Sequence, residues 1–525
     1  MRRRHALKTA LGGIAAPFVL GAEVRAQASR DGVLRIVNAV ELDTLDPHAV
    51  LDTGRLNFKI NVYDSLFRFQ GNPPKLEPWL ADKLDASPDG TVYTLHLKHG
   101  VKFHDGTEMT ADDVVYAMER MLAMKQGPSR LYLDIVAPGA TRAVDRYTVE
   151  FKLKRAAAPF EELLAECYIV NSALVKKNEK NGDWGREWMA RNTASSGSWV
   201  VTSWEPSTGW EADRFKDHFK GWQDKAPTGV RFRTMREANS QALAMQRGDI
   251  DLFVGTLSVD QIEKMAKSAN VAPMREPNLR LLLLSFNTKK PPFDDPHVRR
   301  AFSMAFDYEG WLNGIMKGAA VRATGAIPPQ LPGAVPKPLF NYDLKAAADE
   351  LAKATAKVDR PVSIHVMTGI ARTEQCAQVL QAGLKSLGIT ANIVSETWPT
   401  LANRCRAIET TPDIMTIWTG PEYLDLQNWV GDAYDQTRWG DYKSCTYFSS
   451  DEITAKIKRA YSSLDPAERL KLYSEVAVAA AEGAASIYVH SESWLGVRNK
   501  RVQGFVFCPS SSGNDLRSAW LADIA

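Results

Sequence analysis

The chain has 525 residues, enough for two or three domains, and its 45% hydrophobic and 24% charged residues are ordinary for a folded globular protein. Residues 1–28 contain five basic residues and one acidic residue, so the rest has 60 basic against 61 acidic residues and is close to neutral. Nucleic-acid-binding domains usually carry a basic surplus, so nucleic acid is not an expected partner.

Residues 1–28 have the pattern of an export signal. A positive stretch, Arg2–Lys8, precedes a short apolar stretch, Leu11–Gly21, and Ala26–Ala28 offers small residues for cleavage. The apolar stretch is about half of the ~20 residues that a membrane span needs. The pair Arg3–Arg4 resembles a twin-arginine signal. We therefore expect export to the periplasm, with cleavage near Ala28.

Strands and helices alternate along the chain that follows. The apolar run Val33–Val37 predicts a strand, and residues 91–97 alternate between apolar and polar side chains, as in a half-buried strand. Thr110 and Asp113 have the spacing of a capping box at the start of a helix. A further helix is expected over Glu237–Arg247.

The second half of the chain continues the alternation. Residues 361–394 predict a strand, a helix over Thr373–Leu387 and a parallel second strand, joined with the usual right-handed crossover. Asp295 and Pro296 are typical of a helix start. The run Asp465–Glu468 predicts a full capping box before a long helix, with Leu470 on its inward face.

No strong signature of catalysis or metal binding is present. Phosphate-binding, zinc-protease and serine-hydrolase motifs are missing, so no catalytic residue, cofactor or metal is expected. His96 and His99 have opposite parity in a strand and therefore face opposite sides of the sheet. His365 is expected to be a strand residue with a satisfied hydrogen bond. The five cysteines are widely scattered, and one or two disulfides between them are possible.

One segment resembles the signature of family 5 extracellular solute-binding proteins, the receptors of dipeptide, oligopeptide and nickel ABC importers. Further matches follow in family order along the whole mature chain. The matching residues are Leu76, Pro78, Leu80-Ala81, Ser87-Pro88-Asp89-Gly90, Gly100-Val101-Lys102-Phe103-His104-Asp105-Gly106, Thr110-Ala111-Asp112-Asp113-Val114, Leu45-Asp46-Pro47, Gly248-Asp249-Ile250-Asp251, Phe286-Asn287, Pro291-Pro292-Phe293-Asp294-Asp295 and Tyr342-Asp343.

The resemblance implies an α/β fold, a type II two-lobed periplasmic-binding-protein clamp. One lobe would hold residues 29–285 with an extra subdomain at about 73–185, the second lobe 286–489, and residues 490–525 would return to the first. Crossings near Leu283–Asn287 and Ile487–His490 would form a two-segment hinge. Such a clamp closes when a ligand touches both lobes.

The chain departs from the dipeptide receptors of this family in its charged residues. Those receptors carry Trp-Thr-Gly-Asp, whose Asp receives the ligand ammonium, whereas Pro421 follows Gly420 here. Glu422 or Asp425 would have to replace that carboxylate, although a shift of one residue turns a side chain away. The family arginine for the ligand carboxylate is missing from residues 365–369, and Arg372 is expected as an exposed residue of the first helical turn.

The resemblance also indicates which residues line the cleft, although each aromatic residue also fits a buried core. Ser195–Ser198 approaches the ligand or forms only a turn that packs Trp199. The expected ligand-binding residues are Thr53, Gly54, Trp199, Trp398, Trp418, Gly420, Glu422, Tyr423 and Asp425.

The sequence thus predicts a monomeric, non-catalytic periplasmic receptor that passes a small polar solute, peptide-like by family, to the permease of an ABC importer. Longer peptides held by their backbone remain open. A receptor for an opine, oligosaccharide, amino-acid conjugate or metal chelate is the alternative. A secreted hydrolase on the same scaffold is a further one.

Overall fold

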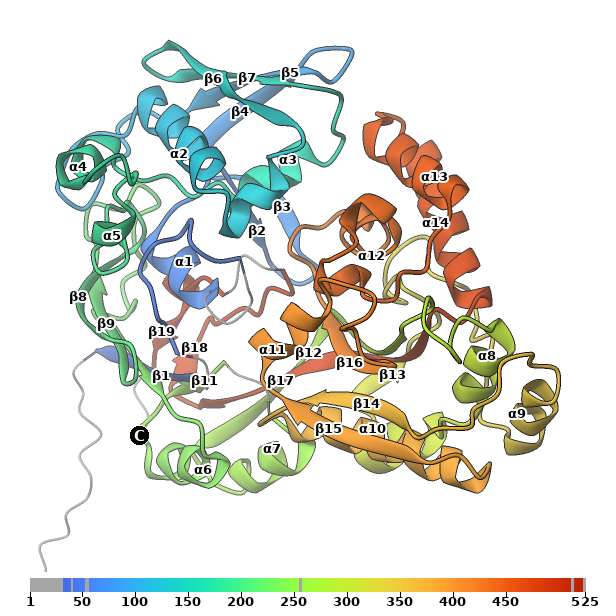
Figure 1. Cartoon of the computed structure of the whole chain (residues 1–525). Helices are drawn as coiled ribbons and strands as arrows, with labels where there is room; N and C mark the ends of the chain where they lie inside the picture. Colours follow the sequence, from blue (N-terminus) through green and yellow to red (C-terminus); the bar gives the residue numbers. More distant parts are fainter. Residues whose placement is uncertain (1–31, 39–40, 52–55, 255–256, 511–513, 523–525) are drawn as a thin grey trace, which may run out of the picture.

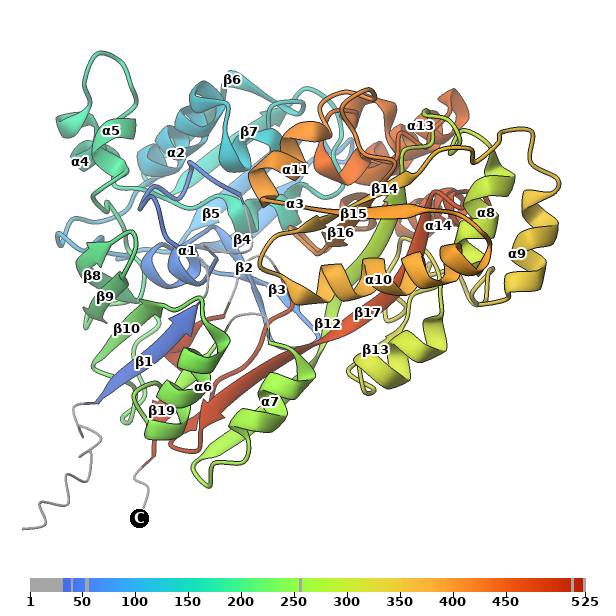
Figure 2. The same ribbon diagram turned by 60° about the horizontal axis from the view of Figure 1, so that its bottom comes forward.

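The computed structural model describes residues 32–38, 41–51, 56–254, 257–510 and 514–522 (Figures 1 and 2). The expected export signal lies outside them. A large mixed sheet runs through the whole molecule. In spatial order it contains β15 (Ala391–Glu396), β14 (Val362–Met367), β16 (Ile414–Thr419), β12 (Val271–Phe286), β17 (Ser486–Asn499), β11 (Leu252–Phe253), β1 (Val33–Asn38), β10 (Gly229–Thr234), β9 (Gly209–Arg214) and β8 (Trp199–Glu205), with β13 (Ala320–Arg322) paired to β17.

Two long strands, β12 and β17, connect the two ends of this sheet. They pair antiparallel from Val271↔Asn499 to Ser285↔Ser486, with two register shifts on the way. One end of β17 pairs with β11, and the other end of β12 pairs with β16. We call the described residues before 271 and after 499 lobe I, residues 287–485 lobe II, and the two strands the hinge strands. The expected two-lobed α/β fold is confirmed (Figure 1).

Lobe I carries a second, antiparallel sheet. Its strands lie in the order β4 (Ala81–Ala86), β5 (Val92–Leu97), β7 (Thr148–Leu153) and β6 (Val136–Asp145), beside the hairpin of β2 (Phe67–Gln70) and β3 (Lys75–Pro78). The predicted capping box of Thr110 and Asp113 forms at α2. The helices of lobe I are α1 (Leu56–Val62), α2 (Ala111–Met124), η1 (Gly127–Leu131), α3 (Phe160–Leu163), η2 (Leu164–Glu166), α4 (Ser172–Asn178), α5 (Arg186–Met189), α6 (Ala238–Arg247) and α7 (Val259–Met265).

Helices cover both faces of the sheet in lobe II. The predicted strand–helix–strand unit is present, with β14 and β15 parallel and α10 packed on them (Figure 2). Leu401 of α11 and several residues of α14 share a core on the opposite face. The helices are α8 (Pro296–Met304), η3 (Gly310–Ile315), α9 (Leu344–Leu351), α10 (Ala371–Ser386), α11 (Trp398–Arg404), η4 (Leu426–Asn428), α12 (Gly431–Tyr434), η5 (Gln436–Arg438), η6 (Tyr442–Ser444), α13 (Asp451–Ser462) and α14 (Pro466–Glu482).

The start of α14 differs from the prediction. Asp465 accepts a hydrogen bond from the Ala467 amide, but Glu468 does not complete the box and instead binds the Ser463 hydroxyl at 2.6 Å and Arg459 of α13. An opposite charge on the neighbouring helix competes for the Glu468 carboxylate. Leu470 is 37% exposed and does not face the core.

All five cysteines are free thiols and all are buried. The disulfides that the sequence left open are therefore not formed in the structure. Within the described residues, no helix is both long and apolar enough to cross a membrane.

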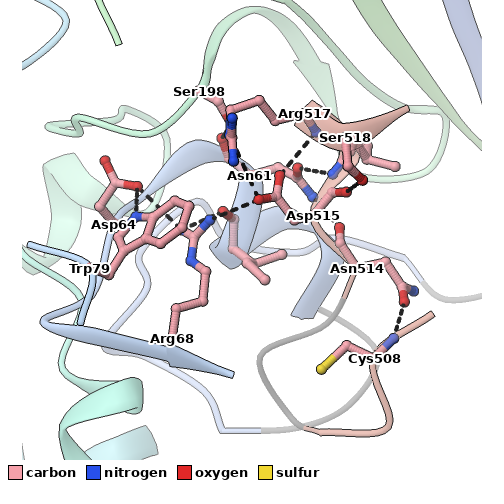
Figure 3. A network of polar contacts seen from close by, with 12 residues as sticks. Asn61, Asp64, Arg68, Trp79, Ser198, Cys508, Asn514, Asp515, Arg517 and Ser518 are labelled. Carbon is pink, nitrogen blue, oxygen red and sulfur yellow. Dashed lines mark hydrogen bonds and ion pairs between the residues drawn. The ribbon is translucent and has the colours of Figure 1, made fainter. Parts of the chain in front are cut away.

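The end of the chain is attached to lobe I by a buried polar network (Figure 3). The Asn61 side chain donates to the Asn514 carbonyl at 2.9 Å and accepts from the Leu516 amide at 2.9 Å. The Arg68 guanidinium lies 3.6 Å from Asp515. Burial alone would raise the pKa of Asp64, but His218 and Arg68 outweigh it and lower that pKa. Residues 514–516 are thereby fixed against α1.

The packing of α10 on α8 gives a test of the fold. At Gly383, an added Cβ atom would lie 1.8 Å from the Ala305 carbonyl oxygen, so Gly383→Ala forces the helices apart. We expect a loss of about 1–3 kcal/mol, seen as a melting temperature several degrees lower. Gly314→Ala is the control because nothing lies within 4 Å of its added Cβ atom. Equal melting temperatures for the two variants would contradict this packing.

Candidate functional site

A buried cluster of charged side chains lies on the hinge strands where they meet lobe II. It joins Arg280 of β12, Glu492 of β17 and Arg372 near the start of α10. The Arg372 guanidinium donates to Glu492 and, at 2.8 Å, to the carbonyl of Leu257 in lobe I. Burial alone would raise the pKa of Glu492, but the positive charge of Arg372 outweighs it and the pKa is lowered to about 2. The carboxylate is therefore charged at any ordinary pH.

Arg280 connects this cluster to Trp418. Its guanidinium carbon lies 4.8 Å from the centroid of the Trp418 ring. An added Cβ atom on Gly420 would lie 3.5 Å from Cγ of Arg280, so the backbone at Gly420 passes over the arginine stem. Trp418 is 7% exposed and packs with Leu282 in the core that includes α10. Trp418 and Gly420 thus both lie beside Arg280 at the carboxyl end of β16, and their role in ligand binding stays a prediction.

Glu422 joins the two lobes. Its carboxylate binds Arg130 of lobe I and Lys443 of lobe II, and it accepts a hydrogen bond from the Tyr442 hydroxyl at 3.1 Å. Burial alone would raise the pKa of Glu422, but Arg130 and Lys443 outweigh it and lower the pKa to about 2. The turn before it is fixed by Asn428, which donates to the Gly420 carbonyl and accepts from the Glu422 amide, both at 3.1 Å.

Trp398 belongs to the same group of residues. It is half-buried at the first position of α11, and its ring meets the Tyr442 ring edge-on with centroids 5.0 Å apart. Burial and the negative charge of Glu422 raise the pKa of Tyr442 well above its ordinary value, so its hydroxyl stays protonated and donates. Tyr442 therefore connects Trp398 with Glu422 within lobe II.

Tyr423 and Asp425 point to other contacts. Tyr423 is buried among apolar residues of the second sheet of lobe I, and its hydroxyl donates to Asp432 at 3.3 Å. Asp425 caps η4 and binds Arg469. Burial raises the pKa of Asp425 even though Arg469 opposes the shift.

Asp425 also lines a cavity of about 530 Å³ between the lobes. The core that contains Trp429 and Leu279 lies on one face of the hinge strands, and the core that contains Trp418 and Leu282 lies on the other. The cavity is thus separated from Trp418 by the sheet. It is lined by Asn72, Pro73, Pro74, Pro277, Leu279, Gln330, Leu331, Pro332, Leu424, Asp425, Leu426, Trp429, Pro466, Arg469, Leu470, Tyr473 and Pro509.

The remaining predicted residues do not join the group. Trp199 is fully buried in the core of lobe I, where it meets Trp222 edge-on at 5.0 Å. Ser195, Ser196 and Ser198 are buried beside it, and the two interpretations of this segment stay predictions. Thr53 and Gly54 lie outside the described residues.

Several residues of the group were not identified from the sequence. Arg372 was expected to be exposed, which is wrong: it is 9% exposed because Glu492 and the Leu257 carbonyl bind it. Arg280 and Glu492 were missed, although Arg280 is the one charge in the apolar run 279–284. The prediction for His365 is confirmed, since its Nδ1 lies 2.7 Å from Glu396. Among the residues that the structure describes, no cluster suited to a metal ion occurs.

The chain is similar to known binding proteins over most of its length. The family described as "Bacterial extracellular solute-binding proteins, family 5 Middle" matches residues 75–441. The probable D,D-dipeptide-binding periplasmic protein DdpA of Escherichia coli K12 is 29% identical over 91% of this chain and 92% of that protein. The dipeptide-binding protein of the same strain is 26% identical over 86% of this chain and 87% of that protein.

Solved structures show the same fold. The crystal structure of a dipeptide binding protein from Pseudoalteromonas sp. SM9913 in complex with Met-Leu covers 93% of this chain and 100% of its own, with a TM-score of 0.83 and 19% identity. The periplasmic binding protein DppA from Helicobacter pylori in complex with the peptide STSA covers 94% and 98%, with a TM-score of 0.80 and 23% identity.

The contact between Glu422 and Arg130 can be tested by substitution. Glu422→Gln leaves Lys443, whose side chain is 1% exposed, without its closer carboxylate, so we expect about 3 kcal/mol of destabilisation. The lowered pKa means that the contribution of Glu422 is present above its ordinary pKa and is lost only as the pH falls towards 2. The loss should therefore be the same at pH 5.5 and pH 8 in urea denaturation.

The matched control is another ion pair between the lobes, Asp134 with Arg438 at 3.5 Å. Asp134 is 62% exposed, so Asp134→Asn should cost less than about 1 kcal/mol. Equal costs for the two variants would show that Glu422 does not hold the lobes together.

Proposed function

Because the chain belongs to the family 5 extracellular solute-binding proteins, we propose that it captures a peptide or peptide-like polar solute and delivers it to the permease of an ABC importer. The observation that carries the proposal is the pair of hinge strands, which are the continuous connection between two lobes that contact each other through Glu422 and Arg130. A ligand held between such lobes stabilises the closed form in proportion to the contacts that it makes with both.

The carboxyl end of β16 is suited to an extended peptide. β16 pairs with β12 along its whole length, up to Thr419. Its pairing with β14 on the other side includes only Ile414 and Met415. The edge of β16 beyond Met415 is thus outside the ladder with β14, and an extended ligand adds to such an edge through main-chain hydrogen bonds. Trp398 and Trp418 flank this edge and supply aromatic surface for its side chains.

The proposal includes the predicted limits of the lobes. Lobe bounds at 29–285 and 286–489, an extra subdomain at about 73–185 and a return at 490–525 are supported by the pairing of Leu283 with Tyr488, where the hinge strands enter lobe II. We propose a receptor without catalytic activity, which is supported by the binding-protein names of its relatives, and we further propose that it acts as a monomer. Residues 1–28 direct it to the periplasm and are removed near Ala28.

The test is to purify the protein from periplasm, release any bound compound by denaturation and identify it by mass spectrometry. We expect a peptide or peptide-like compound that rebinds unchanged and lowers the radius of gyration measured by X-ray scattering. Chemical alteration of the compound by the protein, or no compaction with it, would contradict the proposal.

A substitution at Trp398 tests the position of the solute. Trp398→Ala should weaken binding of the released compound about 10-fold in calorimetry, because half-buried aromatic surface is removed beside Tyr442. The control is Trp188→Ala, because Trp188 is also half-buried but lies on the peripheral α5 of lobe I. Equal affinities of the two variants would place the solute elsewhere.

A further inference from the structure

We propose that Arg280 binds a carboxylate of the captured solute and thereby makes this receptor selective for acidic ligands. The inference rests on the proposed function, because it needs a solute at the carboxyl end of β16. It does not depend on whether that solute is a peptide.

The first argument is the charge of the cluster. Two guanidinium cations, Arg280 and Arg372, face one carboxylate, Glu492. His490 adds no charge, because the indole of Trp311 donates to its Nδ1 at 2.9 Å and burial lowers its pKa. The cluster therefore carries one positive charge in excess. A half-buried charge without a counter-charge keeps part of its desolvation penalty, and an anion placed beside it removes that part.

The second argument is that Arg280 has donors to spare. Arg372 uses its guanidinium on Glu492 and on the Leu257 carbonyl. Among the described residues, the polar contact of Arg280 is a single long one, 3.5 Å from Nη1 to Glu492. A guanidinium has five N–H groups, so several are left for a ligand. The Arg280 side chain is 27% exposed, which leaves it a path to the solute.

The third argument is geometry. The Trp418 ring lies against the face of the Arg280 guanidinium. The backbone at Gly420 lies along the aliphatic part of Arg280, and Gly420 has no side chain that would cover the arginine. A stacked arginine keeps its edge for hydrogen bonding, and that edge matches a carboxylate with two parallel bonds. The carboxylates that follow Gly420 in the chain have partners of their own. Glu422 binds Arg130 and Lys443, and Asp425 binds Arg469.

Neutralising Arg280 also affects the residue that contacts lobe I. Arg372 reaches across to Leu257 of lobe I from the same cluster, and burial together with repulsion by Arg372 lowers the pKa of Arg280. A solute carboxylate at Arg280 reduces that repulsion. A solute with a carboxylate therefore relieves an unfavourable interaction next to Arg372, the residue that contacts lobe I.

The experiment begins with a thermal-shift screen of the wild-type protein against peptides, N-acyl amino acids, sugar acids, neutral sugars, polyols and amines. The strongest binder and its primary amide, in which the carboxylate is blocked, are then titrated by calorimetry into wild type, Arg280→Gln and Arg280→Lys. We expect an acidic binder, about 30-fold weaker binding to Arg280→Gln, an intermediate loss in Arg280→Lys, and a similar 30-fold loss when the amide binds wild type. Arg280→Gln should bind acid and amide alike.

The melting temperature without ligand separates binding from a structural role. Arg280→Gln removes the excess charge, so its melting temperature should equal or exceed that of wild type. The control is Arg322→Gln: Arg322 also stacks on an aromatic ring, Tyr308, but donates to the carbonyls of Tyr488 and Phe340. That variant should melt earlier and bind the solute normally.

The outcomes distinguish the two proposals. An acidic binder that is not peptide-like but depends on Arg280 supports the role of Arg280 and contradicts the peptide ligand. A neutral or cationic peptide as the strongest binder supports the peptide ligand and overturns the selectivity for acidic solutes, and equal affinity of that peptide for wild type and Arg280→Gln overturns the role of Arg280. Acid and amide binding wild type within 3-fold, or Arg280→Gln losing melting temperature but not affinity, overturns it as well.

Discussion

The antiparallel pairing of β12 with β17 is the interaction on which the rest of the molecule depends. These strands belong to the main sheet of both lobes, because β11 of lobe I and β16 of lobe II add to them at opposite ends. One hydrophobic core, which contains Phe253 of lobe I and Phe302 of lobe II, packs on one face of this pair. The register shifts near Pro277–Leu281 and Leu282–Leu283 interrupt the ladder near Arg280. The hinge is therefore also the place where the charged cluster is anchored.

The contact between the lobes combines apolar burial with paired charges. Tyr423 packs into the core of the second sheet in lobe I, and Leu424 packs against Phe69 and Cys508. Glu422 is the charged member of this contact, and its low pKa keeps it ionised wherever the protein is folded at moderate pH. Glu492 has a similarly low pKa in the hinge cluster. Both carboxylates thus hold their arginine partners without a change of charge between pH 5 and 8.

Local features of the structure could be predicted from the sequence, and tertiary charge pairs could not. The strand–helix–strand unit around α10 and the capping box of Thr110 follow from spacing within a few residues. Glu468 had the right spacing for a box, but Arg459 on the neighbouring helix binds it instead. Arg372 looked like a solvated helix residue because its partner Glu492 lies 120 residues away. The family pattern predicts Trp418 and Gly420 as ligand-binding residues, and the residues that carry the resemblance do not include Arg280.

The replacement at position 421 links the lobe contact to the charge of the site. With Pro421 in place of an acidic residue, the nearest carboxylate is that of Glu422, one residue further along. In this structure Asn428 holds the turn so that Glu422 meets Arg130 of lobe I. The Glu422 carboxylate pairs with Arg130 of lobe I and Lys443 of lobe II. Because the acidic side chain serves the protein rather than the solute, the excess charge near Trp418 is positive. This positive excess favours an acidic solute.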